Sequence, residues 1–217
     1  IGHIANECDL PFVEASNHFE AQGARDGVVE ASGQLKTIAA SFMKIANDIR
    51  WLGSGPRTGF YEIALPSIQP GSSIMPGKVN PVMCEMLTMV SAQVMGNDVA
   101  INIGGQGGNF ELNVYLPMMA HNLLQSVSIL ANGAQTFTDR CVVGIEANEE
   151  ICTQSVERNL AICTSLAPAI GYDKAAAISK EAFKTNRTVR EVAIEWDVLP
   201  SDELNTLLDG RAMTEPS

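Results

Sequence analysis

Apolar side chains recur at spacings of three and four residues along three long stretches of the chain. The stretches run from about residue 17 to 52, from 82 to about 103 and from about 113 to 143. In the first, the stripe consists of Val28, Ala31, Leu35, Ile38, Phe42, Ile45, Ile49 and Leu52. This spacing places apolar residues on one side of a helix, as in long helical bundles. Strand-like alternation is nearly absent, so the pattern predicts an all-α fold, a long-helix bundle.

The ends of these stretches carry residues that are typical of helix ends. Asn17, followed by Glu20 three residues later, is a typical N-cap. Residues 53–56, Gly-Ser-Gly-Pro, stop the first helical pattern. Pro81 stands at the first turn of the second, where proline is favoured. Residues 104–108, Gly-Gly-Gln-Gly-Gly, predict a break before the third.

After Gly144 the helical patterns become short. They cover residues 149–159, 160–166, 174–185, 189–195 and 201–208. We therefore predict that residues 1–147 form part of a helical-bundle domain and that residues 148–217 form a small C-terminal helical domain. Because so small a remainder cannot cover long helices, we expect upstream sequence and other subunits to bury them. The alternative is a monomeric bundle that upstream sequence alone completes.

Composition narrows the classes of function. The 217 residues are 46% hydrophobic but only 6% aromatic, and the net charge is -11. An acidic chain argues against a nucleic-acid partner or an anionic membrane surface, because both require a basic face. No apolar run approaches the ~20 residues of a spanning helix. The chain starts at Ile1, within a helical pattern, so we expect a part of a longer cytoplasmic protein, or of a mitochondrial-matrix protein if an upstream targeting segment exists.

Cysteine and histidine positions give no indication of a metal site. The five cysteines stand at positions 8, 84, 141, 152 and 163, without a CxxC pair. Most fall in apolar helical patterns, which favours buried free thiols in a reducing compartment. His3, His18 and His121 lack ligand-like spacing. We therefore expect neither a metal nor another cofactor.

A polar loop rich in glycine and proline, residues 71–81 (Gly-Ser-Ser-Ile-Met-Pro-Gly-Lys-Val-Asn-Pro), lies between the first two helical stretches. The hydroxyls of Ser72 and Ser73, the ammonium of Lys78 and the carboxamide of Asn80 can grip an anionic substrate. The following helix would turn its N-terminus, which favours anions, toward the loop. Taken alone, the loop is equally compatible with a solvated connector.

Two nucleotide-binding motifs are excluded by their spacing or by the residues at their key positions. The glycines of a GxxxxGK motif beginning at Gly71 are separated by five residues instead of four, and Val79 replaces the Ser or Thr that holds magnesium. A dinucleotide motif beginning at Gly105 has Phe110 at its third glycine position.

The loop of residues 71–81 resembles the signature loop of the fumarase/aspartase superfamily. Further segments are similar to class II fumarases: residues 44–51, 55–57, 93–98, 108–114 and 144–149. The resemblance covers essentially the whole chain. The Met-Pro-Gly-Lys-Val-Asn-Pro segment is more similar to fumarases than to aspartases, which tend to carry Ala at the Gly77 position, or to argininosuccinate and adenylosuccinate lyases.

The resemblance implies a homotetramer around a central helical bundle, with active sites shared by three subunits. It implies reversible hydration of fumarate to (S)-malate by anti addition of water through a carbanion, without metal. Two upstream regions of the family, which bring Thr, Asn and a catalytic His, are not in these residues, so the chain alone should lack a complete site. The alternatives are aspartate ammonia-lyase, another lyase of the superfamily, or a catalytically inactive helical scaffold.

The resemblance also assigns catalytic roles. Ser72 matches the base that acts on the substrate carbon. A serine alkoxide is unfavourable at neutral pH, so it requires backbone N–H donors and a nearby cation such as Lys78. Glu85 matches the carboxylate that orients the His of a neighbouring subunit. Without the resemblance, Glu85 would be interpreted as a first-turn carboxylate that stabilises its helix.

The remaining roles are in substrate binding. Lys78 and Asn80 match residues that bind the substrate carboxylate and stabilise the charge that develops on it. Ser73 matches a substrate-contacting hydroxyl, and Val79, between Lys78 and Asn80, is assigned to the same substrate-binding group. We also expect closure of this loop to exclude water from the carbanion.

Overall fold

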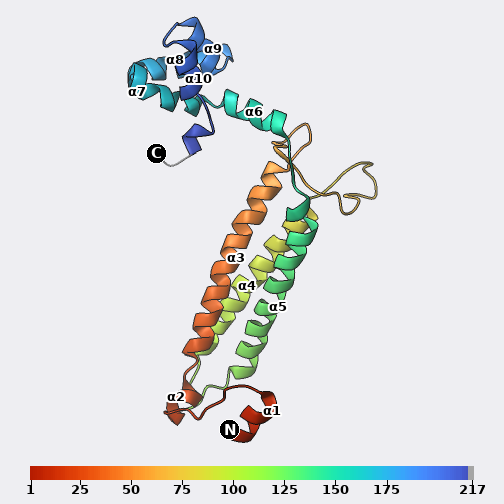
Figure 1. Cartoon of the computed structure of the whole chain (residues 1–217). Coiled ribbons are helices and arrows are strands. Elements are labelled where there is room, and N and C mark those ends of the chain that lie inside the picture. The colour runs from red at the N-terminus through yellow and green to blue at the C-terminus, as the bar shows by residue number, and fades with distance from the viewer. Residues whose placement is uncertain (215–217) are drawn as a thin grey trace. The chain divides into compact units, whose positions relative to one another are not determined.

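A computed structural model of the chain describes residues 1–214. It divides into two compact units, Ile1–Glu146 and Ala147–Ser217, and their division lies one residue before the predicted boundary. The last three residues of the predicted C-terminal domain lie outside the described residues. Both units are helical, which confirms the predicted all-α fold (Figure 1). Among the described residues, no helix combines the length and apolarity needed to cross a membrane.

The first unit is built on three long helices that lie side by side (Figure 1). They are α3 (Asp26–Leu52), α4 (Val82–Gln106) and α5 (Leu116–Arg140), and α4 packs against both of the others. Leu87 and Val94 of α4 are almost fully buried, as are Leu130 and Phe137 of α5. Burial of each large apolar side chain stabilises the fold by about 1.5–3 kcal/mol. Much of the apolar pattern predicted on α4 and α5 therefore lies in the core, but Leu116 and Val127 of α5 are 43% and 47% exposed.

The stripe predicted on α3 is only partly correct. Ala39 and Ala46 are fully buried in the bundle, whereas the larger Ile38 and Ile45 are 44% and 43% exposed. Each isoleucine precedes a buried alanine by one residue, which is a rotation of about 100° around the helix. The small side chains of the two alanines allow α4 to approach α3 closely. The isoleucines therefore lie on a side of α3 that α4 does not cover.

Polar contacts fix the register of the three helices. The buried carboxylate of Asp98 on α4 accepts hydrogen bonds from Ser32 Oγ (2.8 Å) and Lys36 Nζ (2.6 Å) on α3. On the other side of α4, Asn97 Nδ2 donates to Ser126 Oγ of α5 at 3.0 Å. Buried polar groups need such partners, so a shift of one helix along another would leave them unsatisfied.

The predicted first helix is interrupted, which corrects the prediction of one helix over residues 17–52. Helix α1 (Gly2–Cys8) is followed by α2 (His18–Gly23), and Ala24 then adopts an extended conformation before α3 begins. Just before this break, the carbonyl of Gln22 accepts a hydrogen bond from the N–H of Asn113 at 3.0 Å. The interruption therefore coincides with a hydrogen bond to the loop between α4 and α5. The local sequence does not reveal this contact.

Helix α4 runs through the glycines that predicted a break at residue 104, and ends at Gln106. A Cβ atom at Gly104 would lie 2.7 Å from the Cγ atom of Met119 on α5. Glycine at this position therefore allows close packing of two helices and does not end one.

The connection between α3 and α4, residues 53–81, extends from one end of the bundle (Figure 1). It begins with a turn in which the N–H of Tyr61 donates to the carbonyl of Ser54 at 2.8 Å. Strand β1 (Ile63–Ala64) then pairs with β2 (Glu146–Ala147), which follows the short 3-10 helix η1 (Val142–Gly144). This pairing holds the middle of the connection beside the end of α5.

The second unit consists of short helices around its own apolar core. They are α6 (Glu149–Arg158), η2 (Leu160–Leu166), α7 (Ala167–Ile170), α8 (Tyr172–Thr185), α9 (Val189–Glu195), α10 (Ser201–Leu207) and η3 (Ala212–Thr214). Leu166, Ile178, Val192 and Leu204 are buried together. The positions of these helices agree closely with the predicted short patterns.

The cysteines are all free, but only two are buried, which corrects the prediction that most are buried. Cys84 and Cys141 lie in the core of the first unit, Cys152 and Cys163 are partly exposed, and Cys8 is exposed. Burial, and secondarily the neighbouring Cys141, raises the pKa of the Cys84 thiol to about 12.

We expect Cys84 and Cys141 to resist alkylation by iodoacetamide in the native protein at about pH 8, and to react after unfolding. A thiol with a raised pKa stays protonated in the folded state at a pH where the unfolded chain releases its proton. The contribution of Cys84 to stability should therefore fall as the pH rises from about 9 to 12. Peptide mapping of the alkylated protein measures the labelling, and rapid native labelling of Cys84 would contradict the described core.

Candidate functional site

The loop of residues 71–81 is closed at its base by two hydrogen bonds. The N–H of Gly71 donates to the carbonyl of Lys78 at 2.7 Å, and Asn80 Nδ2 donates to the carbonyl of Gly71 at 3.0 Å. A Cβ atom at residue 71 would lie 2.6 Å from the Lys78 carbonyl oxygen, so only glycine fits here without a backbone shift. The loop leads directly into α4, whose N-cap is Pro81.

Ser72 lies inside this closed loop and is partly buried. Its Oγ accepts hydrogen bonds from the backbone N–H groups of Ile74 and Met75, both at 3.2 Å. Two N–H dipoles directed at one oxygen favour negative charge on it. The geometry therefore contains the backbone donors that a serine base requires.

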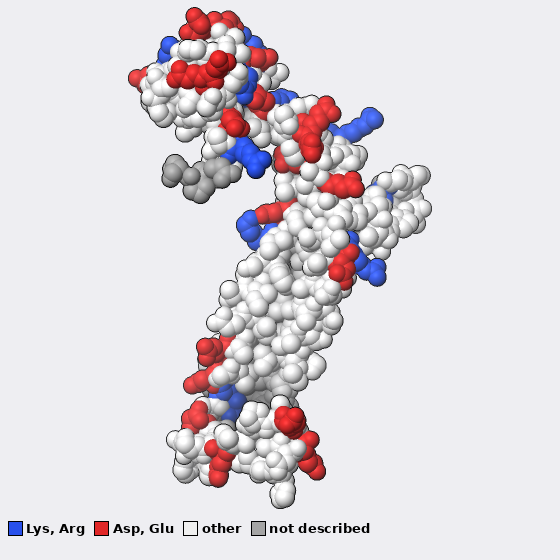
Figure 2. All heavy atoms as spheres, in the orientation of Figure 1, with Lys and Arg blue, Asp and Glu red and all other residues white. Residues whose placement is uncertain are grey.

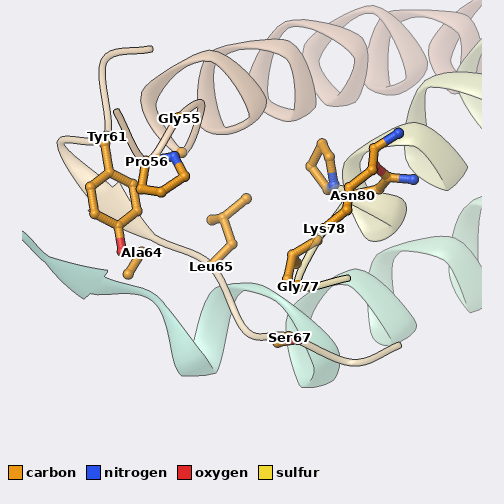
Figure 3. A pocket seen from close by; sticks show the side chains of 12 residues that line it. Gly55, Pro56, Tyr61, Ala64, Leu65, Ser67, Gly77, Lys78 and Asn80 are labelled. Atoms are coloured by element: carbon orange, nitrogen blue, oxygen red, sulfur yellow. The ribbon is translucent and has the colours of Figure 1, made fainter. Parts of the chain in front are cut away.

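Lys78 and Asn80 line a cavity of about 410 Å³, here called the Lys78 cavity. Its wall consists of Gly53, Gly55, Pro56, Tyr61, Ala64, Leu65, Ser67, Gly77, Lys78, Val79, Asn80 and Pro81. Figure 3 shows Lys78 and Asn80 on one side of the cavity, with Pro56 and Tyr61 on the opposite side. Among the described residues, no carboxylate pairs with the Lys78 ammonium. This cation is therefore available to an anionic ligand.

Lys78 also lines a second hollow of about 540 Å³, here called the Ser72 groove. Ser72, Met75 and Pro76 contribute to it, and it shares Ser67, Gly77, Lys78 and Val79 with the Lys78 cavity. Lys78 thus lines one hollow together with Ser72 and the other together with Asn80. Four of the six predicted site residues, Ser72, Lys78, Val79 and Asn80, are brought together by these two hollows.

Ser73 and Glu85 line neither hollow. Ser73 is exposed, and Glu85 is partly buried in the first turn of α4, where its N–H donates to the carbonyl of Pro81 at 3.0 Å. Within the described part of the chain, the Glu85 carboxylate has neither an ion-pair nor a hydrogen-bond partner. It can therefore serve a partner that is not among these residues.

The sequence prediction missed the wall opposite Lys78. Pro56, Tyr61 and Leu65 come from the turn that follows α3 and from the segment after it. Their signal in the sequence was the Gly-Pro pair at residues 55–56, which marks a sharp change of direction near the end of a long helix. That signal predicts a turn, but it does not indicate that the turn faces the loop of residues 71–81.

One segment in each of the two units matches a known protein family. Residues 1–96 match a family described as Lyase, and residues 162–215 match a family described as Fumarase C C-terminus.

Individual relatives agree with these matches. The chain is 54% identical to the class II fumarate hydratase of Thermosynechococcus vestitus over 202 residues, which are 93% of this chain and 43% of the relative. It is also 54% identical to the mitochondrial fumarate hydratase 1 of Arabidopsis thaliana, with 99% of this chain and 44% of the relative covered. The chain therefore spans less than half of the length of these curated relatives.

Solved structures show the same fold. A class II fumarase from Schistosoma mansoni superposes with a TM-score of 0.89 and 39% identity, over 96% of this chain and 43% of the other. A fumarate lyase:delta crystallin from Brucella melitensis, bound to cobalt, gives a TM-score of 0.91 and 40% identity, over 99% of this chain and 46% of the other.

The long-helix bundle and the two family matches place the chain in the fumarase/aspartase superfamily. Within that superfamily, the two relatives that are 54% identical over nearly the whole chain are both fumarate hydratases. The chain belongs to the class II fumarase family and corresponds to the C-terminal portion of its members.

Proposed function

We propose that this protein is a fumarate hydratase, which catalyses the reversible hydration of fumarate to (S)-malate. The observation that carries the proposal is the placement of Ser72, whose Oγ accepts two backbone N–H bonds in a groove that also contains Lys78. A hydroxyl stabilised as an anion beside a free cation suits proton removal from a dicarboxylate. The relatives at 54% identity are named fumarate hydratases, which supports this substrate over others.

In the direction from malate to fumarate, Ser72 takes a proton from the carbon next to a carboxylate. The electron pair left on that carbon spreads onto the carboxylate, so negative charge grows there as the proton leaves. Lys78 and Asn80 increase the rate to the extent that they bind the carbanion intermediate, with its additional negative charge, more tightly than they bind the substrate. The hydroxyl group on the neighbouring carbon leaves anti to the removed proton and takes up a proton to form water, and Ser72 then releases its proton to solvent.

Asn80 can serve both the loop and the substrate. A carboxamide has two N–H donors and one acceptor oxygen. One N–H donates to the carbonyl of Gly71, and the other donor is left for a carboxylate. Ser73 supplies a further hydroxyl to the substrate, and Val79 contributes a side wall to both hollows. The backbone of the loop thus sets the positions of all four substrate-binding residues.

The assembly that we propose is a homotetramer, with each active site formed by three subunits. Several large apolar side chains of the bundle are exposed in the single chain, including Val99, Ile103, Leu124 and Val127. Figure 2 shows that the middle of the bundle carries almost no charged side chain on the visible face. Burial of these residues between subunits would remove a large apolar surface from water.

We place the enzyme in the cytoplasm, or in the mitochondrial matrix where an upstream targeting segment is present. Relatives of both origins support this: one is a bacterial protein and the other a mitochondrial protein of a plant.

The assay that tests the function follows the ultraviolet absorbance of fumarate as it forms from (S)-malate in the presence of the full-length enzyme. A parallel cuvette contains aspartate free of ammonia. Signal with malate alone is expected. Signal with aspartate alone would assign the protein to the ammonia-lyases, and silence in both would indicate another substrate or an inactive scaffold.

Replacing Glu85 with glutamine is expected to lower kcat roughly tenfold and to shift one limb of the pH–rate profile to lower pH. In our proposal the Glu85 carboxylate orients an imidazole of a neighbouring subunit and favours its protonated form, and the neutral amide does neither. Steady-state kinetics from about pH 6 to 9 measures both effects. A loss of rate without any shift of the profile would contradict the proposed partner.

A further inference from the structure

Tyr61 has a backbone conformation that side chains rarely adopt. Its φ angle is 48°, in the left-handed region, where residues other than glycine, asparagine and aspartate are uncommon. Unfavourable conformations of this kind persist where the surroundings over-determine them, and they concentrate at functional sites. Tyr61 also lines the Lys78 cavity. Among the residues other than glycine in the 53–81 connection, Tyr61 alone combines these two features.

Hydrogen bonds on both sides hold Tyr61 in place. Its own N–H donates to the carbonyl of Ser54 at 2.8 Å, and the next residue, Glu62, donates to the carbonyl of Leu52 at 3.0 Å. The preceding N–H, of Phe60, donates to Ser54 Oγ at 3.1 Å. Three consecutive N–H groups are thus anchored to the end of α3 and to the turn that follows it. The backbone from which the ring extends cannot shift without breaking these bonds.

The ring of Tyr61 is packed against the Gly55–Pro56 turn. A Cβ atom at Gly55 would lie 3.1 Å from Tyr61 Cβ and 3.6 Å from its Cγ. In Figure 3 the ring and Pro56 lie together, across the cavity from Lys78 and Asn80. The cavity is therefore bounded by cationic and amide groups on one side and by a fixed aromatic ring on the other.

We propose that Tyr61 is a specificity-determining residue that limits the Lys78 cavity to unbranched four-carbon dicarboxylates. This inference rests on the proposed function, because it takes the Lys78 cavity as part of the substrate site. At about 410 Å³ the cavity is near the lower end of the range for small-molecule sites, roughly 300–1,000 Å³. In a cavity of this size a rigid ring leaves little space for a branch, whereas a flexible side chain would move aside. The ring therefore rejects a substrate that carries a methyl group on either of its two central carbons.

The experiment compares kcat/KM for fumarate and for methylfumarate in the full-length enzyme and in three variants of Tyr61. Tyr61→Phe keeps the ring and should retain the preference for fumarate. Tyr61→Gly and Tyr61→Asn remove the ring, and both residues tolerate a positive φ, so the turn should be preserved. In these two variants the preference should fall by roughly tenfold or more, since one methyl group in a pocket changes kcat/KM by about 10–200-fold.

Phe60→Ala provides a matched control, because it removes an aromatic ring one residue away that does not line the Lys78 cavity. Its substrate preference should equal that of the parent. If a ring-deleted variant has no turnover, calorimetric dissociation constants for succinate and methylsuccinate give the same ratio without catalysis. An unchanged ratio in both Tyr61→Gly and Tyr61→Asn would overturn the proposal. The rate of the parent enzyme with fumarate separately tests the proposed function.

Discussion

Replacing Ser72 with alanine is expected to lower kcat by roughly 10²–10⁴-fold while leaving the thermal stability of the enzyme nearly unchanged. The substitution removes the oxygen that accepts the N–H groups of Ile74 and Met75, and in our proposal this oxygen is the base. Stability should change little, because the loop is largely exposed and contributes no side chain to the core clusters of the bundle. Malate turnover and the midpoint of thermal unfolding are the two measurements.

Ser155→Ala is the control for this variant. Ser155 is an exposed serine of α6, and its replacement should alter neither rate nor stability. A Ser72→Ala enzyme that kept more than about a tenth of the parent rate would show that another group removes the proton. A large loss of thermal stability would indicate that Ser72 has mainly a structural role.

Replacing Gly71 with alanine is expected to lower kcat/KM by about 10²-fold, although residue 71 contributes no side chain to the chemistry. The new Cβ atom would lie 2.6 Å from the Lys78 carbonyl oxygen and 3.0 Å from the N atom of Asn80. The loop must open to relieve this overlap, which displaces Ser72 relative to both residues. A displacement of about 1 Å at a reacting group costs on the order of 10²-fold in rate.

Gly27→Ala is the matched control for Gly71→Ala. Gly27 is exposed in the first turn of α3, and apart from its own helix backbone no atom of the described residues lies within 4 Å of the Cβ position. This variant should retain full activity and be stabilised by up to about 1 kcal/mol, since alanine favours helix more than glycine does. Steady-state kinetics and thermal unfolding of both variants separate the two effects. An unchanged kcat/KM in Gly71→Ala would show that catalysis does not depend on the closed conformation of the loop.

The candidate site divides into a part that was readable from the sequence and a part that was not. Ser72, Lys78 and Asn80 lie within nine residues, so their proximity follows from chain connectivity and from the glycines and prolines that shape the loop. Tyr61 is separated from Lys78 by a strand and a second loop, and local spacing carries no information about contacts of this kind. The left-handed conformation of Tyr61 was equally hidden, because hydrogen bonds to Ser54 and Leu52 hold the backbone in it against the preference of a tyrosine.

The sequence by itself determined the all-α class, the three long helices, the short helices of the second unit and the loop that carries the candidate chemistry. These features follow from hydrophobic spacing and from glycine and proline positions, which act over a few residues. Only the tertiary structure decided that Ala39 and Ala46 are buried in place of Ile38 and Ile45, that the helix is interrupted at Ala24, and that Gly104 lies inside a helix. Each of these depends on what a distant segment brings close, and therefore on packing.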